Sequence, residues 1–214
     1  MNGDVVFADR ADAGRQLAAR LEYLRPSDPV VVGLPRGGVP VAYEVAQALH
    51  APLDVIVVRK LGVPIDPEVA MGAIGEAGAR VLNDDVLRHA GVSPEQLRSV
   101  EDREQAQLVA REVLFRGGRA RVELSGRVVI IVDDGIATGA TARVACQVAR
   151  QRGAIRVVVA APVAPAGVAP RLGADEVVCV LEPPQFWAVG AHFRDFAATT
   201  DAEVVALLAA GMVS

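Results

Sequence analysis

Five short apolar runs recur along the chain, and the residues between them follow a helical spacing. The runs occupy residues 30–34, 53–58, 128–132, 157–160 and 177–181. Their β-branched and almost continuously apolar character is typical of strands that are buried on both faces of a parallel sheet. Strands that alternate with helices favour right-handed crossover connections. The sequence therefore predicts an α/β fold, a mostly parallel twisted sheet flanked by helices.

Two segments interrupt this alternation. Residues 62–119 begin with a stretch rich in glycine and proline at 62–78, which we expect to be a flexible loop. Residues 182–199 follow the last apolar run and hold half of the aromatic residues. We expect one domain over residues 1–214, with a core at about 28–62 and 120–181, an inserted loop and helix at about 62–119, and a small C-terminal hood at about 182–199.

Capping signals predict two helices outside the alternating pattern. Ser93 at the N-cap, Pro94 at the first helical position and Gln96 three residues after the cap indicate the start of a long helix. Its middle, at residues 101–107, is polar all round, so we expect part of it to stand in solvent or to bridge two lobes. Thr200, with an acid three residues later, indicates a last short helix.

The charge balance argues against nucleic-acid and membrane partners. Lys and Arg number 22 against 26 Asp and Glu, which gives a net charge of -4. No uncharged stretch reaches the ~18 apolar residues needed to span a bilayer, and the acidic start of the chain is unlike a signal peptide. A cytoplasmic location is therefore expected. Acids are interleaved with the arginines of the inserted helix region, which we interpret as a solvated face: Arg98, Arg103, Arg111, Arg116, Arg119 and Arg121.

The most informative stretch is residues 128–142, VVIIVDDGIATGATA. Asp133 and Asp134 stand where its strand ends, and ligands of open α/β sheets bind beyond the carboxyl ends of strands. The turn that follows opens a helix, so backbone N–H groups, the helix dipole and the hydroxyls of Thr138 and Thr141 can cradle one phosphate. Carboxylates repel a phosphate but suit the hydroxyls of an attached sugar. The pattern predicts a sugar phosphate site, the alternative being a capped helix with ordinary turn residues.

Two further motifs place positive charge at strand ends. Arg36 and Gly37 follow the first strand, where glycine allows the backbone to approach an anion closely and Arg36 adds charge. Arg59 and Lys60 end the second apolar run. Taken alone, the first motif favours an ordinary turn and the second favours a pair of solvated charges. All three motifs converge at one end of the predicted sheet, and this convergence favours a single site.

An apolar strand, two acids, a short spacer and Thr-Gly-x-Thr together resemble the signature of type I phosphoribosyltransferases, which bind phosphoribosyl pyrophosphate (PRPP). The resemblance implies that Asp133 and Asp134 hold the ribose hydroxyls. It assigns the 5′-phosphate to the residues Ala137, Thr138, Gly139, Ala140 and Thr141. It assigns the pyrophosphate to the residues Arg36, Gly37, Arg59 and Lys60.

The loop expected at residues 62–78 corresponds to the segment that closes over the site in this family and excludes water. Glu76 is the carboxylate in this loop that could handle a proton, and a solvated acid is the alternative. Together with Asp133, Asp134 and Arg36 it completes the catalytic set that we expect.

The hood carries a second resemblance, to the 6-oxopurine phosphoribosyltransferases, in the run Trp-Ala-Val-Gly from Trp187 and in Asp195 with the aromatic residue after it. It implies that Trp187 stacks on the base, for which core packing is the alternative. It also implies that Asp195 helps to bind Mg²⁺ and pyrophosphate. Ala137 and Phe186 stand where those enzymes carry an acid and a lysine, so the acceptor base stays open.

The resemblance as a whole implies an enzyme that moves the phosphoribosyl group of PRPP to a nitrogen nucleophile, with a nucleobase as the expected acceptor. Pyrophosphate would leave, Mg²⁺ would be the cofactor and a homodimer the assembly. In its layout the chain resembles bacterial phosphoribosyltransferase-domain proteins of unassigned substrate. Two alternatives remain open: a regulator that senses PRPP or a nucleotide, and a generic mononucleotide-binding domain.

Overall fold

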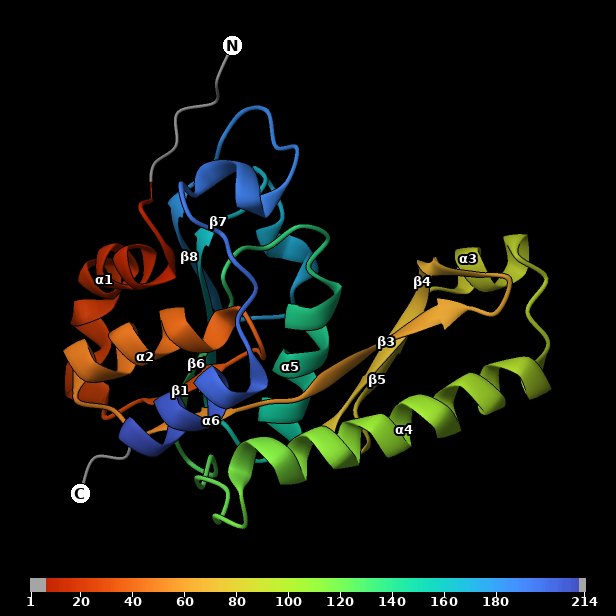
Figure 1. Cartoon of the computed structure of the whole chain (residues 1–214), viewed down its shortest axis with the longest axis horizontal. Helices are drawn as coiled ribbons and strands as arrows, with labels where there is room; N and C mark the ends of the chain where they lie inside the picture. Colours follow the sequence, from red (N-terminus) through yellow and green to blue (C-terminus); the bar gives the residue numbers. More distant parts are fainter. Residues whose placement is uncertain (1–6, 212–214) are drawn as a thin grey trace.

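A five-stranded parallel sheet forms the centre of the computed structural model, which describes residues 7–211 (Figure 1). Its strands are β1 (Val30–Gly33), β2 (Leu53–Val55), β6 (Val128–Val132), β7 (Arg156–Val163) and β8 (Glu176–Leu181). They lie in the order β2-β1-β6-β7-β8, and each neighbouring pair is parallel. The chain moves outward from β1 in one direction and from β6 in the other, which leaves a topological switch point between them. The expected α/β fold class is confirmed.

Helices cover both faces of this sheet, as the unbroken apolar runs predict. They are α1 (Arg10–Leu21), α2 (Gly38–Leu49), α5 (Ala140–Gln151) and α6 (Asp201–Ala210). Because side chains alternate along a strand, Val31, Ile130 and Val158 pack in one buried cluster with α1, α2 and α6. Val129 and Ile131 lie in a second cluster with α5. Figure 1 shows α1 and α2 on one side of the sheet and α5 on the other.

The chain between β2 and β6 builds an arm that projects from the core (Figure 1). Its elements are β3 (Val58–Val63), β4 (Asp66–Gly75), β5 (Arg80–Leu82), α3 (Asp84–His89) and α4 (Pro94–Arg116). The loop expected at residues 62–78 is instead mostly strand, because β3, β4 and β5 form an antiparallel sheet. Its glycines allow close pairing: a Cβ on Gly62 or Gly72 would lie 2.5 Å from a carbonyl oxygen of the facing strand.

The apolar run at residues 53–58, expected to be one strand, is divided between two sheets. Its first half is β2 of the main sheet, and its last residue begins β3 of the arm. Between them the N–H of Val57 donates to Glu76 Oε1 over 2.8 Å instead of to a strand. At the point where the chain leaves the core, a side-chain carboxylate therefore replaces the backbone hydrogen bonds of a neighbouring strand.

The helix α4 runs along the arm and returns to the core. Its predicted capping box is present, since Ser93 Oγ accepts the N–H of Gln96 and the Gln96 side chain accepts the N–H of Ser93. The box predicted at Thr200 is present as well. The polar middle bridges two elements, because Glu104 binds Arg59 of β3 over 2.8 Å. No helix between residues 7 and 211 is long and apolar enough to cross a membrane.

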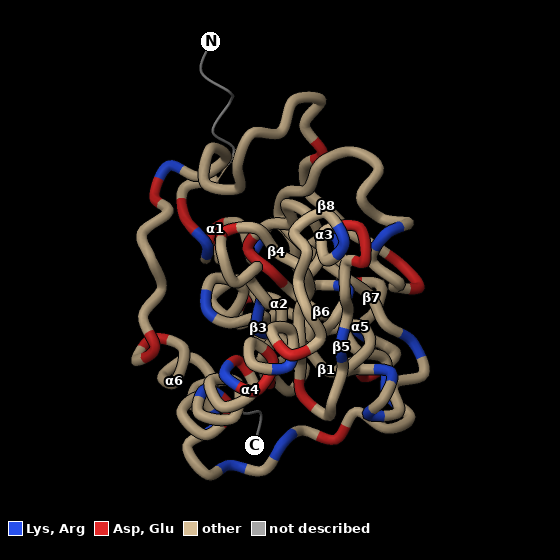
Figure 2. The backbone as a smooth tube through the Cα atoms, turned by 90° about the vertical axis from the view of Figure 1, so that its right-hand side faces the viewer, with Lys and Arg blue, Asp and Glu red and all other residues tan. Residues whose placement is uncertain are grey.

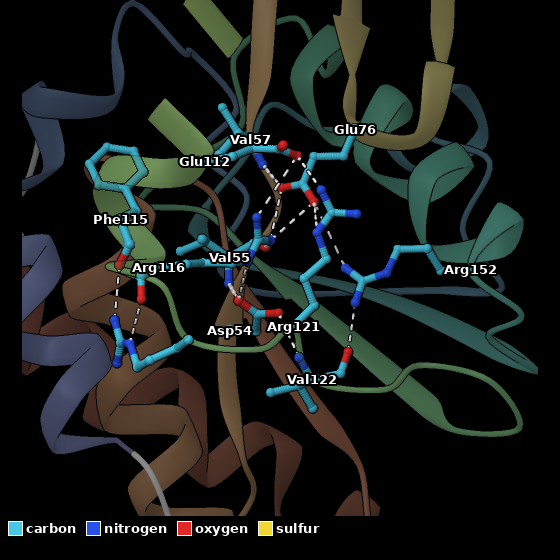
Figure 3. A network of polar contacts seen from close by, with 11 residues as sticks. Asp54, Val55, Val57, Glu76, Glu112, Phe115, Arg116, Arg121, Val122 and Arg152 are labelled. Atoms are coloured by element: carbon cyan, nitrogen blue, oxygen red, sulfur yellow. Dashed lines mark hydrogen bonds and ion pairs between the residues drawn. The ribbon is translucent and has the colours of Figure 1, made fainter. Parts of the chain in front are cut away.

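Arg116, at the end of α4, lies in a buried network of charges at the root of the arm (Figure 3). Its Nη2 atom lies 3.0 Å from both carboxylate oxygens of Glu76, and its Nε atom donates to Asp54 Oδ1 over 3.2 Å. Burial raises the pKa of Glu76, and the charge of Arg116 opposes that rise. Because Asp54 belongs to β2 and Glu76 follows β4, the network joins the arm to the main sheet.

Replacing Arg116 with Met should lower the free energy of unfolding by about 3–5 kcal/mol, because two buried carboxylates would lose the cation that lies closest to them. The matched control is R88M, since Arg88 pairs with Asp85 at the surface and such a pair contributes at most about 1 kcal/mol. Urea unfolding followed by circular dichroism measures both changes. If both variants lose the same small amount of unfolding free energy, the buried network does not stabilise the fold.

Candidate active site

The loops that follow β1 and β6 meet at the switch point of the sheet. The N–H of Leu34 donates to the carbonyl of Val132 over 2.9 Å. A Cβ on Gly37 would lie 2.0 Å from Asp134 Oδ2, and a Cβ on Gly38 would lie 2.6 Å from the Val132 carbonyl oxygen. The absence of side chains on these two glycines therefore permits the contact between the loops. The peptide bond that precedes Arg36 is cis.

The second loop and the start of α5 enclose a hollow of about 140 Å³. Gly139, with φ +77°, is the N-cap of α5 and has no side chain to cap the helix. The first N–H groups of a helix have no partner within it and attract an anion. All five residues expected to bind the 5′-phosphate line this hollow: Ala137, Thr138, Gly139, Ala140 and Thr141. The structure thus brings the predicted phosphate residues together beside Asp133.

The two acids of the motif interact with each other. Asp133 Oδ1 accepts the N–H of Asp134 over 2.9 Å. Burial raises the pKa of Asp133 well above its usual value, and the charge of Asp134 raises it further. Burial also raises the pKa of Asp134, although a neighbouring arginine opposes the rise. Two half-buried carboxylates in contact hold electrostatic energy that hydroxyl donors of a ligand would relieve.

That arginine is Arg10, in the first turn of α1, and nothing in the sequence near Asp134 points to it. Its Nε and Nη2 atoms lie 2.9 Å and 2.8 Å from Asp134 Oδ2. Its Nη1 atom donates to the Ala197 carbonyl over 2.6 Å, and its guanidinium lies 3.9 Å from the centre of the Phe196 ring. Arg10 therefore joins the acid pair to the hood.

The structure separates the residues expected to bind pyrophosphate into two groups. Arg36 and Arg59 line a hollow of about 170 Å³, and Arg111 of α4 joins them there. Successive side chains of a strand point to opposite faces. Accordingly Lys60 lies on the other face of β3, where its Nζ atom is 3.7 Å from Glu68. Acidic and basic residues are interleaved around α4 and β3 in the view along the arm (Figure 2), which is typical of a surface of mixed charge.

Glu76 lies away from these hollows. It was expected in a loop, but only 1% of its surface is exposed and its carboxylate binds Arg116 at the root of the arm. It lines none of the hollows described around the acid pair. Its proton-handling role therefore stays a prediction with no support from its position.

The hood packs over the loop that follows the acid pair. A Cβ on Gly135 would lie 2.4 Å from Val189 Cγ1, so the hood residue rests directly on this loop. Trp187, two residues earlier, is 86% exposed, which disagrees with core packing. Asp195 is exposed, and one of its carboxylate oxygens accepts the N–H of Ala197 over 3.0 Å.

No group of three or more metal-binding side chains occurs within residues 7–211. Mg²⁺ commonly keeps several waters and is held by one or two carboxylates together with substrate phosphates. The exposed carboxylate of Asp195, or one of the acid pair, could supply the single protein ligand of such a site. They do not fit a metal held by the protein alone.

Comparisons with known proteins give the family. Residues 8–192 match the model of the phosphoribosyl transferase domain, and the chain belongs to this family. It is 57% identical over 205 residues to a Mycobacterium tuberculosis protein provisionally named a phosphoribosyl transferase, a match that covers 95% of this chain. The match covers 46% of that protein, so the chain spans about half the length of the curated relatives it matches.

Two further matches are one solved structure and one partial sequence match. The crystal structure of TT1426 from Thermus thermophilus is 46% identical, with a TM-score of 0.80 over 95% of this chain and 97% of that one. The adenine phosphoribosyltransferase of Kineococcus radiotolerans is 40% identical over 83 residues, which cover 35% of this chain and 45% of that protein. The family resemblance predicted from the sequence is confirmed.

Replacing Asp133 with Asn should stabilise the ligand-free protein at pH 8. Folding raises the pKa of Asp133 above the value of about 3.9 in an unfolded chain. The unfolded state therefore loses its proton first, and the free energy of unfolding falls as pH rises from about 4 through the raised pKa. We expect D133N to gain about 1 kcal/mol at pH 8, or about 2–4 °C in the unfolding midpoint.

The gain should be much smaller at pH 4, where the wild-type carboxyl is protonated in the folded state. Scanning calorimetry of both proteins at the two pH values measures the difference. An equal gain at both would show that the amide stabilises the loop for a reason other than the charge.

Proposed function

We propose that the protein transfers the phosphoribosyl group of PRPP to a nitrogen of a nucleobase-like acceptor and releases pyrophosphate. The proposal rests mainly on the arrangement of two hollows around Asp134, one beside the start of α5 and one lined by arginines. The phosphate hollow of about 140 Å³ begins at one side of the acid pair. Gly37 touches Asp134 from the loop that carries Arg36 and leads to the hollow of the arginines. A sugar with a phosphate at one end and a pyrophosphate at the other has this distribution of charge.

Each group of residues has a task in this reaction. The N–H groups at the start of α5, with Thr138 and Thr141, bind the 5′-phosphate. Asp133 and Asp134 accept hydrogen bonds from the ribose hydroxyls and stabilise positive charge on the sugar ring as the bond to pyrophosphate breaks. Arg36 and Arg59 stabilise the negative charge on the leaving group. Mg²⁺, when bound, supplies further neutralisation of the pyrophosphate.

The hood supplies the acceptor end of the site. We assign Trp187 to stacking on the base, because an exposed aromatic ring beside a ligand loop has its face available. The close approach of Val189 to Gly135 supports this assignment, because the segment that carries Trp187 then lies over the loop of the acid pair. The identity of the base is not part of the proposal.

A second candidate function is a regulator that senses PRPP or a nucleotide without turnover. The position of Glu76 favours it, because the carboxylate expected to handle a proton is held in the root of the arm.

Three further expectations stay predictions: a single domain over residues 1–214, a homodimer and a cytoplasmic location. Sedimentation of the purified chain tests the dimer.

Pyrophosphate release from PRPP with Mg²⁺, measured against a panel of purine and pyrimidine bases, tests the proposal. We expect release that depends on one base. D134N should lower it by a factor on the order of 10²–10³, because the carboxylate charge acts on the transition state. D85N, a change in an exposed pair on the arm, should leave it unchanged.

The other outcomes identify the alternatives. PRPP that binds and protects the chain from thermal unfolding without any release would support the sensor. A chain that does not bind PRPP would contradict both functions.

Trp187 is the sole tryptophan of the chain, so its fluorescence reports on the acceptor end directly. If its ring stacks on a base, nucleoside monophosphates should quench the emission as they bind. Ribose 5-phosphate, which has no base, should bind with little change. Quenching that is equal for the two ligands, or absent while calorimetry shows the nucleotide to bind, would contradict the stacking assignment.

A further inference from the structure

Arg36, Arg59 and Arg111 come from three separate elements and line one hollow of about 170 Å³. The first follows β1, the second belongs to β3 and the third to α4. Between a third and a half of each side chain is exposed, so all three guanidinium groups are accessible to a small solute. The resemblance to phosphoribosyltransferases points to the first two of these residues and says nothing of Arg111.

Asp201, in the first turn of α6, binds two of the three arginines. Its Oδ1 atom accepts a hydrogen bond from Arg111 Nη1 and lies 3.7 Å from Arg36 Nη1. Arg59 has a separate partner, Glu104, at 2.8 Å. Three positive side chains thus share two carboxylates, and Glu104 also binds Arg103, so positive charge is in excess around the hollow.

The exchange of Asp201 for a stronger anion is physically favourable. Arginine binds phosphate oxygens in paired, charge-assisted hydrogen bonds, and a pyrophosphate carries several such oxygens where Asp201 offers one carboxylate. When released, Asp201 remains stabilised by the N-terminus of α6, where negative charge is favourable. Arg111 is also held from its own helix, because its guanidinium lies 5.7 Å from the centre of the Phe115 ring.

We propose that Arg111 is a third pyrophosphate-binding arginine, and that Asp201 is an internal anion that occupies Arg111 and Arg36 until the pyrophosphate group replaces it. The inference rests on the proposed function, since that function brings a pyrophosphate to this hollow. It adds a residue from the arm helix and one from the C-terminal helix to the site. Binding of pyrophosphate then exchanges a contact between α4 and α6 for a contact with the ligand.

A purely structural ion pair would behave differently. Loss of either partner would lower the stability of the α4–α6 contact and leave the affinity for pyrophosphate unchanged. An internal competitor gives opposite signs in the two variants, because removal of Arg111 removes a ligand contact and removal of the Asp201 charge removes a rival. The signs of the two effects therefore separate the two accounts.

Calorimetric titration with inorganic pyrophosphate and Mg²⁺, and separately with ribose 5-phosphate, tests the proposal on the full chain. We expect R111Q to raise the Kd for pyrophosphate about 10-fold or more, since a charge-assisted contact is lost. D201N should lower that Kd about 3-fold or more, because it removes the competing charge. The Kd for ribose 5-phosphate should change in neither variant.

Two further variants serve as a control and as a conservative substitution of Arg111. R98Q is the matched control, because Arg98 is an exposed residue of the same helix that does not line the hollow, and it should leave both Kd values unchanged. R111K keeps the ion pair with Asp201, so it preserves the fold if R111Q does not, and should weaken pyrophosphate binding through the loss of paired donation.

Wild-type affinity for pyrophosphate in both Arg111 variants, or weaker binding in D201N, would overturn the proposal. If ribose 5-phosphate fails to bind the wild-type chain while pyrophosphate responds as expected, the proposed function is wrong and the anion site stands. If ribose 5-phosphate binds and the Kd for pyrophosphate is the same in all the variants as in the wild type, the inference about Arg111 and Asp201 is wrong and the proposed function is unaffected.

Discussion

The contact between the loops that follow β1 and β6 is the constraint on which the site depends. Gly37 lies so close to Asp134 that a Cβ would fall 2.0 Å from a carboxylate oxygen, and Gly38 lies as tightly against Val132. Because the strand order reverses between these two strands, the connections that follow them lead to opposite sides, and such a switch point is where open α/β sheets bind ligands. A side chain at Gly38 would meet the backbone of Val132 and Asp133 and push the loops apart, whereas a side chain at Gly37 would displace the carboxylate of Asp134.

The charges that surround this contact are paired with one another in the ligand-free protein. Arg10 binds Asp134 and links α1 to the hood, while Asp201 binds Arg111 and links α6 to the arm helix. Such pairs give buried or half-buried charges a partner. They contribute little net stability, because the cost of removing the charges from water offsets their attraction. In the proposed function, a ligand with two anionic ends and neutral hydroxyls between them would replace these internal partners.

The sheet and the loop that opens α5 could be predicted from the sequence, because both depend on consecutive residues. A strand buried on two faces must be apolar throughout, and the five residues expected to bind a phosphate, from Ala137 to Thr141, are successive and line one hollow. Arg10 and Arg111 could not be predicted, since their roles arise from segments about 90 to 125 residues apart in the chain. The stretch at 62–78 was misjudged because glycine is typical of loops and also permits strands to pair closely. Glu76 was then placed in that supposed loop, whereas long-range pairing buries it.

The central claim is that one ligand spans two subsites, with its sugar held by the acid pair between them. Calorimetric competition among PRPP, ribose 5-phosphate and pyrophosphate, each with Mg²⁺, tests it most directly on the wild-type chain. We expect PRPP to bind once per chain and to be displaced by either of the smaller ligands, while the two smaller ligands bind together without competing. If ribose 5-phosphate and pyrophosphate exclude each other, or if neither displaces PRPP, the two-ended site is contradicted.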